Sequence, residues 1–351
     1  MIYNENMWQL LGQDRVITLL KHELETRQLP HANLLLGPVG IGKMTLALDL
    51  AQSLNCTGDE PPCGNCYTCL RIKSAKHPDI HIIDLQSESK GERKQEVKIG
   101  IEYINDLQSM AKTPPYEGKY KVFIINGAEN LSIEAANTLL KTLEEPPPHI
   151  VIILLASSER DVLPTIVSRC QRLELNPVPL KQLENILIEK YKLDIEQAAF
   201  LARISHGCPG QVLSAIQNDK FLNERTDILN TLVEIIHSNR EGRLNFASHL
   251  TSEFNKNRRS INIIFTLWLD WWRDLFLIRE KNQELIINID RKTELVNHAV
   301  NYTTQQIDIF IREIQATRKY LSQNANSRLV LESLMLNIPS AHISTQARVG
   351  E

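Results

Sequence analysis

Apolar residues along this chain follow two patterns, and the change between them divides the sequence into two kinds of structure. In the first half, short continuous apolar runs alternate with segments of helical periodicity. Continuous apolar runs between helices are typical of a parallel sheet that is covered on both faces. The first half therefore predicts an α/β domain, with strands at Asn33–Leu36, Ile80–Asp84, Lys121–Asn126, Ile150–Ala156 and Gln171–Leu175.

Helices are expected before and between these strands, where apolar residues recur every three or four positions. The predicted helical segments are Gly12–Arg27, Leu46–Leu54, Ile101–Met110, Ser132–Leu143 and Leu163–Cys170. The polar, charge-rich run Ser87–Lys98 is interpreted as a flexible loop.

The second half of the chain has no strand pattern. After Asn176–Pro179, which is typical of a domain boundary, we expect a small helical bundle at Leu180–Asn218 and a larger one at Phe221–Leu336. One helix, Ser260–Lys281, carries a stripe of large apolar residues. Because burial alone demands this period, the stripe indicates core or subunit packing rather than a base-stacking surface. Its members are Ile264, Phe265, Trp268, Trp272, Leu275 and Phe276.

Length and charge restrict the class of protein. A chain of 351 residues is expected to form two or three domains. The net charge of −3, from 39 basic and 42 acidic residues, does not favour a non-specific nucleic-acid or membrane binder. The amino terminus lacks the features of a signal peptide, and the longest apolar run, Ile150–Ala156, is too short to cross a bilayer. A cytoplasmic protein is therefore expected.

The first predicted strand leads into a glycine-rich turn and then a helix, at Leu34–Thr45. This order is typical of a phosphate-binding loop (P-loop), in which backbone N–H groups and a lysine contact phosphate oxygens. Met44 occupies the position where the motif requires a hydroxyl for Mg²⁺, and Thr45 lies roughly 100° further around the helix. The candidate nucleotide-binding residues are Gly37, Gly40, Gly42, Lys43 and Thr45.

The acidic residues of a P-loop ATPase are also replaced. A working site needs an Asp that organises Mg²⁺ and a Glu that polarises water, at the end of a neighbouring strand. Asn126 and Gly127 occupy these positions, and Glu129 is expected to begin the next helix rather than to face the phosphates. The sequence thus predicts no intrinsic ATP hydrolysis, no catalytic residue in cis and no Mg²⁺ site. Binding of ATP or ADP at Lys43 stays open.

Four of the six cysteines form a cluster with the spacing C-x6-C-x2-C-x2-C. Paired cysteines on tight turns are typical of tetrahedral zinc sites, and four thiolates leave no open position for water. We therefore expect a structural zinc module at 56–69; the alternative is four reduced, buried thiols. The expected ligands are Cys56, Cys63, Cys66 and Cys69.

Several segments together resemble the bacterial clamp-loader AAA+ family, whose members are subunits of DNA polymerase III. The Ala135–Pro147 run and the cysteine spacing are the specific parts of the resemblance, whereas a P-loop alone is not. The matching segments are Leu11–Gln13, Leu29–Ala32, Gly37–Lys43, the four cysteines, His77–Asp79, Ala135–Pro147 and Ser168–Cys170, with weaker similarity at Trp271–Leu275 and Asn324–Leu329.

The resemblance implies the domain order and the partners. It implies an α/β P-loop AAA+ domain at 1–176 with the inserted zinc module, an all-helical lid at 177–219, an all-helical collar at 220–338 and a disordered tail at 339–351. It also implies a hetero-pentamer with motor (gamma/tau) and delta subunits. This assembly opens a sliding clamp and places it on primer–template DNA, and no membrane is involved.

In that family, the arginine of the Ser-Arg-Cys motif reaches the γ-phosphate of ATP on a neighbouring motor subunit. The corresponding residue here is Arg169. A guanidinium supplied in trans stabilises charge in the phosphoryl-transfer transition state. The resemblance therefore implies that Arg169 acts as an arginine finger; the alternative is a surface ion pair.

Departures from the motor subunits favour a non-hydrolysing stator. Gln211 stands where motors carry a basic residue, and Ser157 or Ser158 stands near the position that senses the γ-phosphate. Two alternatives remain. One is an active gamma/tau-like ATPase, in which Thr45 or water replaces the lost ligands. The other is a stand-alone zinc-dependent nucleic-acid-binding protein, for which the cysteine module lacks the basic and aromatic residues that such binding requires.

Overall fold

The computed structural model describes residues 8–85, 98–218, 220–323 and 325–340, which form two compact units. One unit contains the residues up to Ile186 together with Ser205–Val212, and the other contains Leu187–Ile204 together with the residues from Leu213 onward. The division into three domains with boundaries at 177 and 220 stays a prediction. The expected loop Ser87–Lys98, apart from Lys98, and the expected tail from residue 341 lie outside the described residues.

The first unit is built on a sheet of five parallel strands in the order β2-β3-β4-β1-β5. The strands are β1 (Ala32–Leu36), β2 (Ile80–Asp84), β3 (Lys121–Asn126), β4 (Ile150–Ala156) and β5 (Gln171–Glu174). These bounds confirm the strands predicted from the apolar runs to within one residue. Because the strands are parallel, their carboxyl ends meet at one edge of the sheet, and the P-loop begins there.

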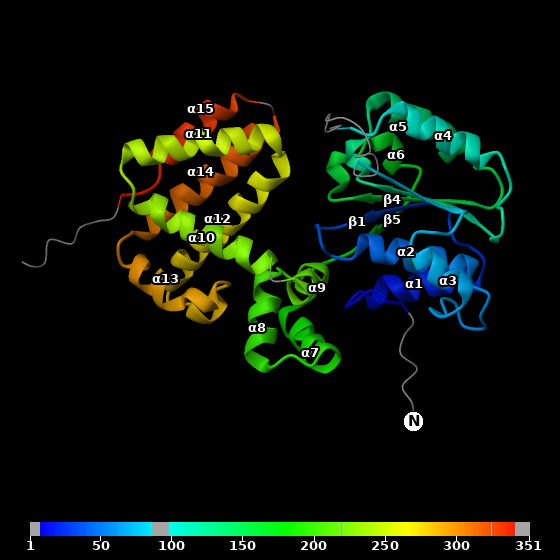
Figure 1. Ribbon diagram of the computed structural model, residues 1–351, viewed down its shortest axis with the longest axis horizontal. Helices are drawn as coiled ribbons and strands as arrows, with labels where there is room; N and C mark the ends of the chain where they lie inside the picture. Colours follow the sequence, from blue (N-terminus) through cyan, green and yellow to red (C-terminus); the bar gives the residue numbers. More distant parts are fainter. Residues whose placement is uncertain (1–7, 86–97, 219, 324, 341–351) are drawn as a thin grey trace, which may run out of the picture. The chain divides into compact units, whose positions relative to one another are not determined.

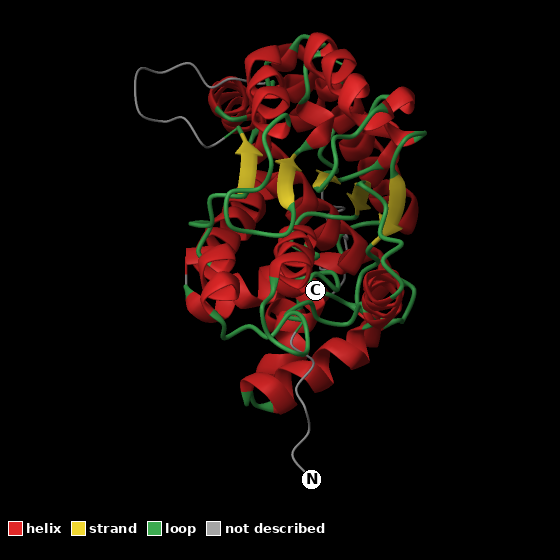
Figure 2. Cartoon of the chain, turned by 90° about the vertical axis from the view of Figure 1, so that its right-hand side faces the viewer, coloured by secondary structure: helices red, strands yellow, loops and turns green. Residues whose placement is uncertain are grey.

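Helices cover both faces of this sheet, as Figures 1 and 2 show. One face packs against α1 (Asp14–Glu25), α2 (Lys43–Asn55) and α3 (Tyr67–Lys73), and the other against α4 (Ile101–Ala111), α5 (Ile133–Glu144) and α6 (Pro164–Val167). Successive strand residues point to opposite faces, so Leu35 packs on the first face and Leu34 on the second, both fully buried. The doubly covered sheet explains why the strands are apolar throughout.

The second unit is helical throughout its described residues. Its helices are α8 (Ile195–Ile204), α10 (Lys220–His237), α11 (Arg240–Lys256), α12 (Arg258–Arg279), α13 (Lys292–Ala299), α14 (Thr304–Ser322) and α15 (Ser327–Leu336). Two further helices, α7 (Leu180–Tyr191) and α9 (Pro209–Gln217), each belong partly to both units. Among the described helices, none is long and apolar enough to span a bilayer.

An aromatic core fills the second unit. Trp268, Trp271 and Trp272 on α12 are each at most 1% exposed. The ring of Trp272 lies 4.8 Å from that of Phe310 and 5.3 Å from that of Tyr302, in edge-to-face geometry. The predicted stripe on this helix is therefore core: four members are buried, and Ile264 and Phe276 are partly buried against the same cluster.

Trp271 lies outside the predicted stripe and is nevertheless fully buried, because α12 packs against α10, α11, α13 and α14. The fourth tryptophan, Trp8, belongs to the first unit and is 4% exposed within the core between the sheet and α1–α3.

Candidate functional site

The P-loop lies between β1 and α2 at the carboxyl edge of the sheet, as the sequence predicts. Gly42 has a φ of 109°, and a Cβ added to it would lie 2.5 Å from Leu10 Cδ1. Glycine alone accommodates both constraints. The helix begins directly afterwards at Lys43, so its amino-terminal N–H groups face the loop.

Lys43 is turned into its own loop. Its Nζ donates to the backbone oxygen of Gly37 and, at 3.0 Å, to that of Pro38. Burial lowers the pKa of Lys43, while the charges of Glu129 and Cys208 act in the opposite direction. Met44 packs against the core between the sheet and α1–α3. The loop therefore keeps its lysine but has an apolar side chain at the position of the metal-binding hydroxyl.

The end of β3 carries an amide instead of a carboxylate. Asn126 Nδ2 donates to Asp84 Oδ2 at 2.9 Å, so this side chain is held by the neighbouring strand. Gly127 follows with a φ of 91°, which turns the chain into a short 3-10 segment, Ala128–Asn130.

Glu129 lies in the short helical segment that follows β3, as expected, and its charge acts on Lys43 of the P-loop. Its Oε1 accepts a hydrogen bond from Ser157 Oγ at 3.2 Å, and its Oε2 is buried without a partner among the described residues. The left-handed turn at Gly127 redirects the segment after β3. The negative charge of Glu129 raises the pKa of Lys43 and so partly opposes the effect of burial.

The turn that leads into α9 lies directly against the P-loop. The N–H of Gly210 donates to the backbone oxygen of Gly40 at 2.7 Å, and Gln211 Nε2 donates to that of Val39 at 3.4 Å. A Cβ on Gly210 would lie 2.7 Å from the Gly40 oxygen, so this close approach requires glycine. Gln211 therefore bonds the loop itself and brings no positive charge to it.

A cavity of about 960 Å³ opens beside the loop. The two serines predicted near the γ-phosphate position, Ser157 and Ser158, line it together with Gly37 and Pro38. Arg172 also lines this cavity and forms an ion pair with Glu159 at 3.1 Å.

Arg169 lies at the opposite edge of the sheet. It directly precedes β5 and bonds Glu144 at the end of α5, where the backbone oxygen of Leu143 lies 2.9 Å from His31 Nε2, just before the start of β1. Gly37 is six residues further along, which is about 20 Å at the rise of a strand. Arg169 is exposed and forms an ion pair with Glu144. The Nε and Nη2 atoms of Arg169 lie 2.8 Å and 2.6 Å, respectively, from Oε1 of Glu144. It is too far from its own P-loop to contact a phosphate there.

The four clustered cysteines converge. Their Sγ atoms all lie within 4.8 Å of one another, and those of Cys63 and Cys69 are 4.0 Å apart. Tetrahedral bonds of about 2.3 Å to zinc would place the sulfurs about 3.8 Å apart, so the set fits this metal. The N–H groups of Gly58 and Cys63 donate to Cys56 Sγ, each at 3.3 Å. Although burial opposes it, donation from Thr57 and Cys69 lowers the pKa of Cys66 to about 6, which favours a thiolate. The cluster could therefore hold zinc.

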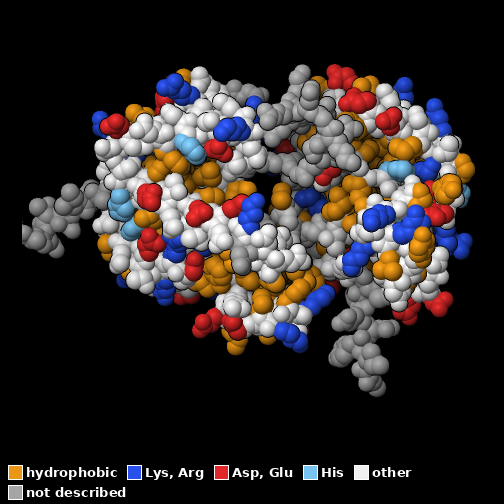
Figure 3. All heavy atoms as spheres, viewed as in Figure 1, with side chains coloured by type: hydrophobic (Ala, Val, Ile, Leu, Met, Phe, Trp, Pro, Cys, Tyr) orange, Lys and Arg blue, Asp and Glu red, His pale blue; other side chains and the backbone are white. Residues whose placement is uncertain are grey.

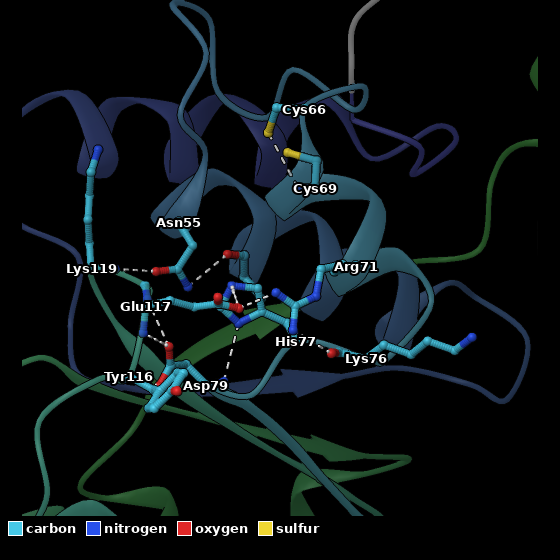
Figure 4. Close-up of polar contacts among 12 residues, drawn as sticks. Asn55, Cys66, Cys69, Arg71, Lys76, His77, Asp79, Tyr116, Glu117 and Lys119 are labelled. Atoms are coloured by element: carbon cyan, nitrogen blue, oxygen red, sulfur yellow. Dashed lines mark hydrogen bonds and ion pairs between the residues drawn. The ribbon is translucent and has the colours of Figure 1, made fainter.

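Polar contacts that the sequence did not predict join the cysteine module to the sheet (Figure 4). Arg71 on α3 forms an ion pair with Glu117, and its Nη2 donates to the backbone oxygen of Lys76 at 3.2 Å. His77 Nε2 lies 3.7 Å from the same carboxylate. Burial lowers the pKa of His77, so this buried imidazole is neutral at pH 7.

Two buried polar side chains hold the segment 116–120 beneath the module. Asp79, which is fully buried, accepts three backbone N–H groups, and Asn55 Oδ1 accepts two. Asn55 ends α2 and directly precedes Cys56. The donors are Tyr116, Glu117 and Gly118 to Asp79, and Lys119 and Tyr120 to Asn55.

Comparisons with known proteins find sequence similarity to subunits of DNA polymerase III. The sequence model described as "DNA polymerase III, delta subunit" matches residues 12–179. The DNA polymerase III subunit delta' of Bacillus subtilis (strain 168) is 30% identical over 328 residues, covering 92% of this chain and 95% of that protein. The tau subunit of Escherichia coli (strain K12) is 35% identical over 213 residues, covering 58% of this chain and 31% of that protein.

Among solved structures, a DNA polymerase III gamma subunit-related protein from Thermotoga maritima aligns with a TM-score of 0.42 and 19% identity. The alignment covers 93% of this chain and 98% of that one. The parallel sheet, the P-loop and the helical carboxyl-terminal part form the α/β P-loop AAA+ architecture with C-terminal helices that the sequence predicts. The near-complete match to the subunit from Bacillus subtilis shows that the chain belongs to the clamp-loader family of DNA polymerase III subunits.

Proposed function

We propose that this chain is the delta-prime, or stator, subunit of the clamp loader, and that it donates Arg169 in trans to ATP bound by a neighbouring motor subunit. One observation carries the proposal: Arg169 is an exposed arginine that bonds Glu144 at the end of α5, beside the start of β1 rather than the P-loop at its end. An arginine in this position serves a phosphate of another chain, where it stabilises charge in the transition state of phosphoryl transfer.

The cis site supports the same assignment, because it lacks the parts that hydrolysis needs. The Mg²⁺-binding hydroxyl is replaced by Met44, the Mg²⁺-organising Asp by the neutral Asn126, and the Glu that polarises water by Gly127. The loop still has the residues of a phosphate-binding loop, namely Gly37, Gly40, Gly42, Lys43 and Thr45. We therefore infer that the loop binds nucleotide without Mg²⁺, with a lower affinity than a complete P-loop.

The inferred partners are motor (gamma/tau) and delta subunits in a hetero-pentamer, with the sliding clamp and primer–template DNA bound through the complex during DNA replication. The zinc module has a structural role, since four thiolates would fill the coordination sphere of the metal. A stand-alone nucleic-acid binder is disfavoured by the net charge of −3, and the face drawn in Figure 3 carries acidic as well as basic side chains.

The test uses the pentamer reconstituted with motor and delta subunits. The purified chain alone is expected to show no ATPase activity, whereas R169A in the complex is expected to lower the clamp- and DNA-stimulated kcat at least tenfold. R172A, which removes a neighbouring arginine beside the cis cavity, is the matched control and is expected to keep wild-type activity. Full activity of the R169A complex would exclude the role in trans, and turnover by the chain alone would favour a gamma/tau-like ATPase.

A further inference from the structure

We propose that Glu144 is a positioning residue for Arg169. Its carboxylate holds the side-on face of the guanidinium so that the remaining N–H of Nη2 is presented to a phosphate of the neighbouring subunit. This inference rests on the proposed function, because it assigns Glu144 a part in the same reaction.

The contacts of Arg169 fix which donors are used. Nε donates to Glu144 Oε1 at 2.8 Å, and Nη2 lies 2.6 Å from the same oxygen. Nε and Nη2 form the side-on face of a guanidinium, so the carboxylate occupies that face. Nη1 donates to the backbone oxygen of Thr165 at 3.0 Å and to Ser168 Oγ at 3.3 Å.

A guanidinium has five N–H groups in a fixed planar fork. With Nε, one N–H of Nη2 and both N–H groups of Nη1 engaged, one N–H remains, on Nη2. None of the hydrogen bonds described for Arg169 uses this remaining N–H. A phosphate oxygen can accept it. The intramolecular bonds therefore orient Arg169 and leave one N–H of Nη2 free for a phosphate.

The fold brings these groups together from separate segments. Glu144 is the last residue of α5, Thr165 lies in α6, and the two helices pack against each other. The side chains of Arg169 and Glu144 are 35% and 50% exposed, respectively. An ion pair this exposed contributes little to stability. Its value lies in orientation, because removing the carboxylate would let a long side chain sample other rotamers.

Glu144 also has an electrostatic effect that opposes this benefit, since a nearby carboxylate weakens the attraction of Arg169 for phosphate. Orientation and charge can be separated experimentally. E144Q keeps an oxygen that accepts from Arg169 and removes the charge, whereas E144A removes both. If orientation dominates, E144Q keeps most of the activity and E144A loses it.

The experiment measures clamp- and DNA-stimulated ATP hydrolysis by the reconstituted pentamer. E144A is expected to lower kcat about three- to tenfold with little change in KM for ATP, and E144Q to lower it less than twofold. The E144A/R169A double variant is expected to be no slower than R169A alone, because both changes remove one function. E145A, which removes the adjacent exposed carboxylate, is the matched control and should behave as wild type.

The outcomes distinguish this inference from the proposed function. If R169A has no effect, the proposed function fails and the positioning role fails with it. If R169A slows hydrolysis while E144A does not, only the positioning role is wrong. If E144A slows the R169A complex further, by the factor it causes alone, Glu144 acts independently of Arg169 and the inference is likewise overturned.

Discussion

Asp79 offers a sharp test of how the cysteine module is anchored to the sheet. Its side chain is fully buried and accepts N–H groups from Tyr116 at 2.6 Å, from Glu117 at 2.9 Å and from Gly118 at 2.8 Å. We expect D79N to open this segment, because one carboxylate oxygen becomes an NH₂ group that cannot accept. The rotamer that keeps the oxygen facing Glu117 and Gly118 places this NH₂ group against the N–H of Tyr116.

The size of the effect follows from these three bonds. Hydrogen bonds to a charged acceptor are worth about 1.5–3 kcal/mol and neutral ones about 0.5–1.5 kcal/mol. Losing one bond and the charge assistance of two others sums to about 5 kcal/mol at the middle of these ranges. Because Tyr116 lies on the surface and water can hydrate its N–H after opening, the expected net loss is about 3 kcal/mol, or roughly a hundredfold in the opening equilibrium.

Hydrogen exchange measured by mass spectrometry on the full, zinc-loaded chain at pH 7 reads out this opening. Peptides that cover residues 112–121 should exchange roughly a hundredfold faster in D79N. D106N, which removes an exposed carboxylate on α4, is the control and should leave these peptides unchanged. Wild-type protection of the 116–118 amides in D79N would refute the reasoning, because it would mean that the three bonds do not hold the segment.

Burial raises the pKa of Asp49 from 3.8 to about 6. Because the folded state then binds a proton more readily than the unfolded state, the free energy of unfolding falls as the pH rises between these two values. The thermal midpoint of D49N relative to wild type should therefore rise from pH 4 to pH 7, and an unchanged difference would contradict this. E129Q removes a carboxylate charge that acts on Lys43 of the P-loop, so it should strengthen ADP binding about tenfold in a fluorescence titration. K43A should abolish ADP binding. Equal affinities of E129Q and wild type for ADP would argue against electrostatic exclusion of the nucleotide by Glu129. Mercurial titration of the thiols should release about one zinc per chain, and C69A, which removes a fully buried thiol, should retain less than about half an equivalent; zinc-free wild-type protein would speak against the site.

The sequence predicted the parts of the fold that depend on local pattern. Apolar runs between helices gave the parallel sheet, and the aromatic period of α12 gave the core of the second unit. The cysteine spacing predicted a cluster whose sulfurs do converge. These features are readable because each follows from the period of a strand or helix, or from ligands close together in the chain.

Contacts between distant segments could not be read in the same way. The partners of Asp79 lie 37 to 39 residues away, and Glu144 lies 25 residues from Arg169, so no local pattern links them. The contact of Glu129 with Ser157 could not be read for a different reason. It depends on a left-handed φ at Gly127, and a glycine in a sequence permits that conformation without requiring it.

The distribution of tryptophan has a practical consequence for spectroscopy. Trp268, Trp271 and Trp272 belong to the helical unit and only Trp8 to the unit that holds the P-loop, and all four are buried. Intrinsic fluorescence of the chain therefore reports chiefly on the helical unit. A denaturation curve followed by tryptophan fluorescence would give little signal for unfolding of the unit that holds the P-loop. Unfolding of that unit needs its own signal, such as release of zinc into a colorimetric chelator.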